Sequence, residues 1–283
     1  MTRSHLPRYQ GSLFDSARWS DVDLRPGDVV VSTPPKSGTT WTLAMAYLIL
    51  HGADARFDRL SSVAPWVDFH GGNPDSPVHR AHAAHGRRLF KTHTPLDGLP
   101  LVDGVAVITV YRDPGDCLLS MRRHLSNMAA PPPDHPNLGP LRKAFDTLLS
   151  RPLDHARFEG VTLSALLHHF RTSESGSTVK IHYRDMSEAP IAALRTLSDG
   201  IGASLDQSSM RAILDRTKKA AMRNHSDAFA PQAKTGFFKD DAGFFSRQSN
   251  SAESLSHAQQ AKLIGRVRTE LDVRSAAWLC RTA

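Results

Sequence analysis

The sequence predicts an α/β protein with a central parallel β-sheet and helices on both faces of that sheet. An apolar β-branched run at residues 29–31 leads through a turn directly into the start of a helix. A second apolar run at residues 105–111 does the same, and strand-like and helix-like segments continue to alternate further along the chain. Because strands that alternate with helices pair in parallel and are covered on both faces, we expect a three-layer architecture.

Length and composition favour one globular domain spanning residues 1–283. The chain has 283 residues, of which 40 % are hydrophobic and 22 % are charged. Only Cys117 and Cys280 are present, too few for a disulfide framework, which indicates a reducing compartment. Residues 1–19 have no apolar core, so neither a signal peptide nor a membrane span is predicted there. We therefore expect a cytoplasmic protein.

The formal net charge of +7 suits an anionic ligand. The basic pairs at residues 87–88, 122–123 and 218–219 are isolated, and no alternation of basic and aromatic residues recurs. We therefore expect a small anionic ligand and no nucleic-acid partner.

Histidines recur at every third position between residues 79 and 85. Helical metal-ligand pairs are usually four residues apart and need a further acid or cysteine nearby. This pattern therefore predicts a solvated histidine face, and we expect no metal site.

The order of elements follows from local signals. Residues 1–27 are polar and end in an Arg-Pro-Gly turn before the first strand. The helix predicted at residues 39–50 is apolar on nearly every side, which is typical of a buried helix, and residues 52–86 are expected to be mainly loop. Asp113 and Pro114 form the N-cap and first position of a further helix. The other predicted strands lie at residues 88–92, 105–111 and 178–183, and the other helices at residues 141–149, 163–172, 188–201, 206–219 and 256–271.

Residues 28–41 form the candidate anion-binding stretch. The strand ends in a turn that contains Lys36 and Gly38, and the next helix begins with the hydroxyls of Thr39 and Thr40. The first N–H groups of a helix lack intrahelical partners and form the positive end of the helix dipole. Such a strand–turn–helix unit is expected to hold a phosphate.

This stretch resembles a Walker A loop, which implies an architecture similar to that of the P-loop nucleoside triphosphate hydrolases. The order of residues differs, because Lys36 precedes Gly38 and two prolines occupy the approach. A nucleotide-dependent kinase, with Asp113 and Asp185 as its candidate magnesium ligands, is therefore the alternative interpretation. A binding module that holds a nucleotide without turnover is a second alternative.

Four segments in order resemble the cytosolic-type sulfotransferases, which use 3′-phosphoadenosine 5′-phosphosulfate (PAPS). Pro-Lys-Ser-Gly-Thr-Thr-Trp at residues 35–41 is similar to their phosphosulfate-binding loop, and Lys-Thr-His-Thr-Pro at residues 91–95 to their catalytic-histidine segment. Tyr-Arg-Asp-Pro at residues 111–114 resembles the 3′-phosphate segment, and Tyr-Arg-Asp-Met at residues 183–186 the segment beside the adenine. The resemblance implies transfer of a sulfuryl group from PAPS to a hydroxyl or amine of a small, apolar acceptor.

The resemblance and the chemistry together assign roles to the catalytic residues. Lys36 is expected to reach the bridging oxygen of the donor, while backbone N–H groups of Ser37 to Thr40 and the hydroxyls of Thr39 and Thr40 hold the 5′-phosphate. His93 is expected to take the proton of the acceptor as general base. By resemblance, Lys91 helps to hold the transferring group. No metal is required by this mechanism.

A second set of residues is assigned to the nucleotide. Arg112 and Ser120, eight positions apart, are expected to bracket the ribose 3′-phosphate, and Ser120 is also counted with the catalytic residues. Trp41 and Tyr183 are the candidates for contact with adenine. Two weaker matches to the family are Thr217, for the adenine-stacking segment, and Arg247, for the segment that closes over the 3′-phosphate, with Lys239 and Lys234 as rivals.

The acceptor pocket is expected to come from residues 52–86, 126–160 and 229–247, because loops vary most and close over ligands. Prolines exclude helix and interior strand from residues 129–140. The aromatic residues that suggest an apolar acceptor are Trp66, Phe69, Phe145, Phe237 and Phe244. The sequence predicts neither the identity of the acceptor nor an oligomeric state.

Overall fold

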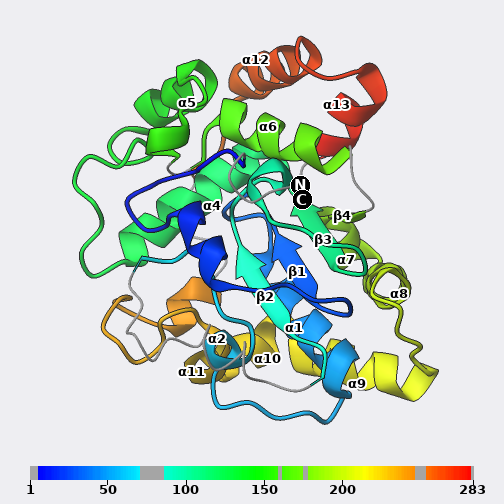
Figure 1. Ribbon diagram of the computed structural model, residues 1–283. Coiled ribbons are helices and arrows are strands. Elements are labelled where there is room, and N and C mark those ends of the chain that lie inside the picture. Colours follow the sequence, from blue (N-terminus) through cyan, green and yellow to red (C-terminus); the bar gives the residue numbers. More distant parts are fainter. Residues whose placement is uncertain (1–5, 71–85, 159–160, 175–177, 246–252, 282–283) are drawn as a thin grey trace.

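The computed structural model describes residues 6–70, 86–158, 161–174, 178–245 and 253–281 (Figure 1). Four parallel strands form one sheet in the order β2-β1-β3-β4. They are β1 (Val29–Ser32), β2 (Leu89–Thr92), β3 (Ala106–Tyr111) and β4 (Thr178–His182). In the register of the sheet, Val30 pairs with both Phe90 and Val107. The predicted parallel sheet is therefore confirmed, with β1 and β3 at its centre.

One face of the sheet packs on a helical layer built around α1 (Thr39–His51). Most side chains of α1 are buried, in keeping with its apolar sequence, and they join those of Val31, Ile108 and Ile181 in one core cluster. The other helices on this side are α2 (Leu60–Val63), α8 (Pro190–Gly200), α9 (Gln207–Thr217), α10 (Lys219–Asn224) and α11 (Ser226–Phe229).

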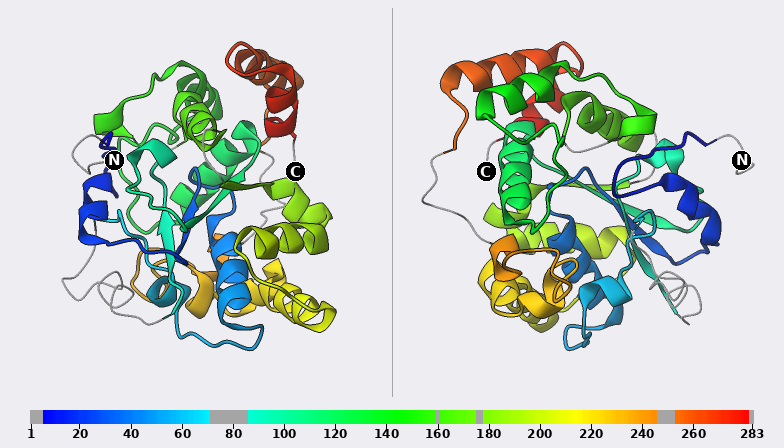
Figure 2. Two further views of the ribbon diagram at one scale, coloured as in Figure 1. Left: turned by 45° about the vertical axis from the view of Figure 1, so that its right-hand side comes forward. Right: turned by 90° about the vertical axis from the view of Figure 1, so that its left-hand side faces the viewer.

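The opposite face is covered by a second helical layer and by the N-terminal segment. Tyr111 lies in a core cluster with α4 (Pro114–Asn127), α5 (Leu141–Ser150), α6 (Leu163–Glu174), α12 (His257–Arg268) and α13 (Val273–Leu279). Figure 2 shows α12 and α13 (orange to red) on the opposite side of the molecule from α9 (yellow). Val30 and Phe90 pack on Trp19 from the 3-10 helix η2 (Ser16–Asp21). Both faces of the sheet are thus covered, as predicted.

The remaining elements are short. They are the 3-10 helices η3 (Leu96–Gly98), η4 (His155–Arg157) and η5 (Ala242–Phe245), and the helix α7 (Tyr183–Glu188) directly after β4. The ring of His182 ends the strand and caps α7, because its Nδ1 accepts a hydrogen bond from the N–H of Arg184.

Three boundaries differ from the sequence prediction. The helix expected at residues 206–219 is two helices, α9 and α10, because Lys218 adopts an extended conformation (φ −53°, ψ 141°). The short helix α7 was not expected, and α8 begins only at Pro190. The C-terminal helix ends at Arg268, and α13 starts anew behind the N-cap Asp272.

Within the described part of the chain, no helix combines the length and the apolar character needed to cross a membrane. The histidines at residues 79–85 lie outside the described residues.

Candidate active site

A predicted site residue follows the carboxyl end of each strand of the sheet. Lys36 follows β1, His93 follows β2, Arg112 follows β3 and Tyr183 follows β4. All four line one cavity of about 870 Å³. The chain passes from β2 across β1 to β3, and open parallel sheets bind their ligands at the carboxyl edge near such a change of direction.

The turn between β1 and α1 has an unusual backbone conformation. Lys36 and Gly38 both have positive φ angles, 68° and 110°. A Cβ on Gly38 would lie 2.8 Å from Cδ2 of Tyr183, so only glycine allows this close approach. Gly38 is the N-cap of α1 and provides no side-chain cap, which leaves the first N–H groups of α1 to an anion.

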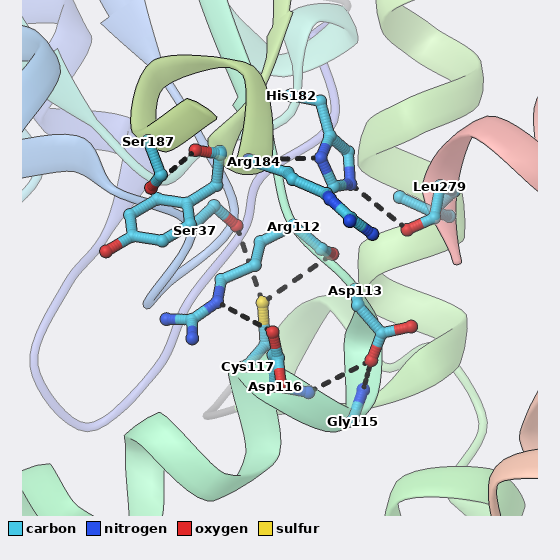
Figure 3. Close-up of polar contacts among 11 residues, drawn as sticks. Ser37, Arg112, Asp113, Gly115, Asp116, Cys117, His182, Arg184, Ser187 and Leu279 are labelled. Atoms are coloured by element: carbon cyan, nitrogen blue, oxygen red, sulfur yellow. Dashed lines mark hydrogen bonds and ion pairs between the residues drawn. The ribbon is translucent and has the colours of Figure 1, made fainter. Parts of the chain in front are cut away.

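Hydroxyl groups on both sides of the turn fix its shape. The Oγ1 atoms of Thr33 and Thr39 lie 2.6 Å apart and are hydrogen-bonded. Ser37 is fully buried, and its Oγ lies 3.7 Å from Sγ of Cys117 in α4 (Figure 3). The Ser37 side chain therefore anchors the turn to α4, whereas Thr39, Thr40 and Trp41 line the cavity.

Lys36 is a buried amine among other cations. Its Nζ lies 3.2 Å from Nδ1 of His124 and 4.7 Å from the centroid of the Phe244 ring. Burial, followed by the charges of Lys91, Arg112 and Arg123, lowers the pKa of Lys36 to about 7. An anion bound beside this amine would restore its charge.

His93 has the tautomer that a general base requires. The residue is 8 % exposed, and its Nδ1 lies 2.7 Å from the carbonyl oxygen of Thr33. A carbonyl only accepts, so Nδ1 carries the proton and Nε2 has the free lone pair. Burial, together with the charge of Lys91, lowers the pKa of His93 well below its usual value. The imidazole is therefore neutral, and the lone pair of its Nε2 is available.

Trp66 connects the basic residues of this region to the aromatic side of the cavity. Nζ of Lys91 lies 3.7 Å from the centroid of a Trp66 ring, and the ring of His93 meets Trp66 edge-on at 5.0 Å. Burial lowers the pKa of Lys91 to about 8, and the charge of Asp68 acts in the opposite direction. Asp68 is fully buried and accepts hydrogen bonds from the hydroxyls of Thr92 and Thr94.

The segment after β3 brings an arginine and an aromatic ring together. Cζ of Arg112 lies 4.5 Å from the centroid of the Tyr183 ring, and its Nε lies 3.4 Å from Oδ2 of Asp116 (Figure 3). Trp41 meets Tyr183 edge-on, with ring centroids 5.8 Å apart. Ser120, two turns along α4, lines the same cavity. The residues predicted for the 3′-phosphate and for adenine are thus brought together.

Some predicted residues are not brought to the cavity. Thr217 is fully buried and donates its hydroxyl to the carbonyl of Ile213, and the next cavity residue along the chain is Lys219. Phe145 belongs to the core between α4 and α6 and was wrongly expected in the pocket. Its four companions in that prediction, Trp66, Phe69, Phe237 and Phe244, do line the cavity.

The C-terminal basic candidates have separate outcomes. Arg247 lies outside the described residues. Nζ of Lys239 donates to the carbonyl of Ser126 at 2.9 Å, and Lys234 pairs with Asp227 at 3.0 Å. Neither lysine is a cavity residue in the described part of the chain.

The two carboxylates proposed for a kinase have other partners. Asp113 caps α4 by accepting hydrogen bonds from the N–H groups of Gly115 and Asp116 (Figure 3). Asp185 forms two hydrogen bonds of 2.9 Å with Arg281. Among the described residues, no cluster of three or more histidine, cysteine or acidic side chains is arranged to hold a metal. The engagement of both carboxylates with other groups of the protein does not favour the kinase alternative.

Several cavity residues were not anticipated from the sequence. Arg123 and His124 lie one turn beyond Ser120 on α4, so they lie on the same side of the helix as Ser120 and line the same cavity. Helical periodicity was therefore the sequence signal that could have identified them. Residues 12–14 also line the cavity, whereas Phe158, which lines it too, falls within the stretch 126–160 expected for the pocket. The proline-rich loop contributes Pro132 and His135, as expected for a loop that borders a pocket.

A turn that leaves helix N–H groups unpaired, a neutral buried imidazole and several cations around one cavity suit a group-transfer enzyme that acts on an anionic donor. Comparison with known proteins specifies the class, since residues 26–253 match the Sulfotransferase domain. The chain belongs to the sulfotransferase family and is a PAPS-dependent sulfotransferase.

Relatives by sequence come from bacteria and mammals. A glycolipid sulfotransferase of Mycobacterium bovis is 30 % identical over 271 residues, which cover 84 % of this chain and 83 % of the relative. A glycolipid sulfotransferase of Mycobacterium tuberculosis is 29 % identical, with 84 % and 82 % covered. Sulfotransferase 1A1 of Canis lupus familiaris is 27 % identical, with 74 % and 70 % covered.

Solved structures show the same fold. Retinol dehydratase in complex with retinol and PAP superposes with a TM-score of 0.71 at 16 % identity, covering 92 % of this chain and 87 % of that one. Mouse sulfotransferase SULT7A1 in complex with PAP gives a TM-score of 0.67 at 17 % identity, covering 93 % and 91 %. The four-stranded α/β architecture is therefore that of the sulfotransferases.

Proposed function

We propose that this sulfotransferase moves the sulfuryl group of PAPS to a hydroxyl of an acceptor with a large apolar part, and that His93 is the general base. The observation that carries this proposal is the hydrogen bond of 2.7 Å from Nδ1 of His93 to the carbonyl of Thr33. It fixes the tautomer in which Nε2 can accept a proton, at a position between the phosphate-binding turn and the aromatic wall.

In the proposed reaction, the acceptor oxygen forms a bond to sulfur while the bond from sulfur to the bridging phosphate oxygen breaks. Nε2 of His93 takes the proton of the acceptor hydroxyl. The ammonium of Lys36 stabilises the negative charge that develops on the leaving 5′-phosphate, and Lys91 neutralises the oxygens of the transferring group. The N–H groups at the start of α1 hold the phosphate in line.

Arg112 and Ser120 are proposed to bind the 3′-phosphate of the donor, and Trp41 and Tyr183 to bind the adenine. The support is that Arg112 lies over Tyr183, Trp41 meets Tyr183 edge-on, and all four residues line the cavity. A guanidinium and a hydroxyl that converge from one loop and one helix are suited to a phosphate dianion.

A glycolipid is the acceptor class that we favour. Support comes first from the relatives, because two mycobacterial proteins with about 30 % identity are glycolipid sulfotransferases. The cavity also has a large apolar lining. Its apolar residues include Leu13, Phe14, Trp66, Phe69, Met128, Phe158, Phe237 and Phe238. Such a lining binds hydrocarbon, and aromatic rings such as those of Trp66 and Phe69 are also suited to pack against a sugar.

A transfer assay with sulfur-labelled PAPS tests the acceptor class. Wild-type protein is expected to sulfate a glycolipid with a kcat/KM at least about tenfold higher than that for the same sugar without its lipid chains, because apolar area is buried only in the first case. The transfer is expected to continue in the presence of a chelator of divalent metals.

Three outcomes of this assay would argue against parts of the proposal. A preference for the free sugar or for a small phenol would contradict the acceptor class. Loss of transfer with the chelator would contradict the metal-free mechanism. Transfer to neither the glycolipid nor the free sugar would place the acceptor outside this class.

Donor binding is expected to be linked to proton uptake at Lys36. The pKa of Lys36 is about 7 in the donor-free protein, so the amine is mostly neutral at pH 8 and mostly charged at pH 6. A phosphate beside it raises this pKa, and binding of PAP at pH 8 is therefore expected to take up roughly one proton.

Calorimetry at pH 8 in buffers of different ionisation enthalpy measures this uptake. Lys91, with a pKa of about 8, also contributes to the proton uptake. The variant Lys36→Met is therefore expected to lose most, but not all, of the uptake. At pH 6 the wild type is expected to show little uptake by either amine. Equal uptake by wild type and Lys36→Met at pH 8 would show that Lys36 does not adjoin the bound phosphate.

A further inference from the structure

The face of α4 that lines the cavity carries a second arginine beside the Arg112–Ser120 pair. Arg123 lies three positions after Ser120, which is one helical turn, and both residues line the cavity. We propose that Arg123 binds the 3′-phosphate of the donor together with Arg112 and so makes the enzyme select donors that carry this phosphate. This inference rests on the proposed donor site.

The charge balance of the cavity supports an anionic partner for Arg123. In the described part of the chain, the cavity is lined by one carboxylate, that of Asp116, against five cationic side chains: Lys36, Lys91, Arg112, Arg123 and Lys219. Like charges held together in a partly desolvated site repel one another, and a multiply charged anion relieves this repulsion. The donor carries two such groups, the 3′-phosphate and the 5′-phosphosulfate.

The adjacent residue Arg122, in contrast, has a structural role. Arg122 donates to both carboxylate oxygens of Glu253, at 2.8 and 2.6 Å, and to the carbonyl of Asn137 at 2.8 Å. For the guanidinium of Arg123, no hydrogen bond or ion pair to any described residue is present. Its donors are therefore available to a ligand in the cavity.

The surroundings of Arg123 place it at the nucleotide end of the cavity. Burial and the charge of Arg112 lower its pKa, while Asp116, Glu253 and Tyr183 act in the opposite direction. Arg112 and Tyr183 are the residues assigned to the 3′-phosphate and adenine, and Arg123 also acts on the pKa of Lys36. The opposite end, around Trp66 and Phe69, has no such link to Arg123 among the described residues.

A comparison of two nucleotides isolates the 3′-phosphate. PAP carries this phosphate, and adenosine 5′-monophosphate lacks it. The variant Arg123→Gln is expected to weaken PAP binding by about 10- to 100-fold in calorimetry, the range of a lost charge-assisted interaction with phosphate, and to change binding of the monophosphate by less than about twofold. With PAPS as substrate, KM is expected to rise while kcat stays within about threefold.

Arg122→Gln is the matched control, because it removes the same charge from the adjacent position. It is expected to leave both affinities within about twofold, and thermal unfolding of both variants checks that they are folded. An equal loss of PAP and monophosphate binding in Arg123→Gln, or an unchanged PAP affinity, would overturn the role of Arg123. A wild type that does not prefer PAP over the monophosphate would instead overturn the proposed donor site.

Discussion

Replacement of His93 by alanine is expected to lower kcat by about 10²- to 10⁴-fold, the usual range for loss of a general base. The ring is held by a hydrogen bond of 2.7 Å from Nδ1 to the carbonyl of Thr33, so Nε2 is left to act as the base. PAP affinity is expected to stay within about twofold, because His93 contacts the acceptor proton and is not assigned to the nucleotide. Single-turnover transfer of labelled sulfate measures the first effect, and calorimetry measures the second.

His257→Ala is a suitable control for this variant. His257 is exposed at the start of α12, outside the cavity, and its removal is expected to leave kcat unchanged. If His93→Ala retains wild-type kcat on an accepted substrate, another group takes the proton. A parallel loss of PAP binding would instead indicate that the ring supports the turn after β1.

The principal site residues were predictable because they depend on the ends of strands. Lys36, His93, Arg112 and Tyr183 each follow a strand, and the carboxyl ends of parallel strands meet at one edge of the sheet. His93 was distinguished from 14 other histidines by its position after a strand and by its flanking residues, not by composition.

Residues that reach the site through tertiary packing were not predicted. Asp68, whose charge acts on Lys91, accepts a hydrogen bond from Thr92, which is 24 positions further along the chain. It lies in a stretch that was predicted only as loop. His124 meets Lys36 across 88 positions, a pairing that no local pattern encodes.

Two residues that were assigned to the cavity are buried in the protein core instead. Thr217 was assigned to the nucleotide, but it ends α9, where its hydroxyl bonds to the preceding turn of the same helix. Phe145 was assigned to the pocket from composition alone, but α5 is an amphipathic helix whose apolar stripe faces the core. In both cases burial, which the sequence does not display directly, decided the role.

Replacement of Lys36 by methionine is expected to lower kcat by about 10²- to 10³-fold, the range for removal of one group that stabilises developing charge. The effect on kcat is expected to exceed the effect on PAPS KM, because negative charge builds up on the bridging oxygen only as the bond to sulfur breaks. The kcat of Lys36→Arg is expected to exceed that of Lys36→Met by less than about tenfold. His124 and the Phe244 ring enclose the amine, and a guanidinium is bulkier. Rates at saturating PAPS measure these effects, with Lys218→Met, an exposed lysine paired with Asp215, as the control.

Lys36→Met is also expected to raise the melting temperature of the donor-free protein. The pKa of Lys36 is lowered from 10.5 to about 7, so between these values the unfolded chain binds a proton that the folded protein does not. Folded stability therefore falls as pH decreases through this range, and methionine, which stays neutral, removes the loss. Lower kcat together with higher thermal stability at pH 7 would show that Lys36 is retained for its reaction at the expense of the fold. A lower melting temperature would show that the amine is stabilised by its neighbours, and a change in KM alone would limit Lys36 to binding of the donor.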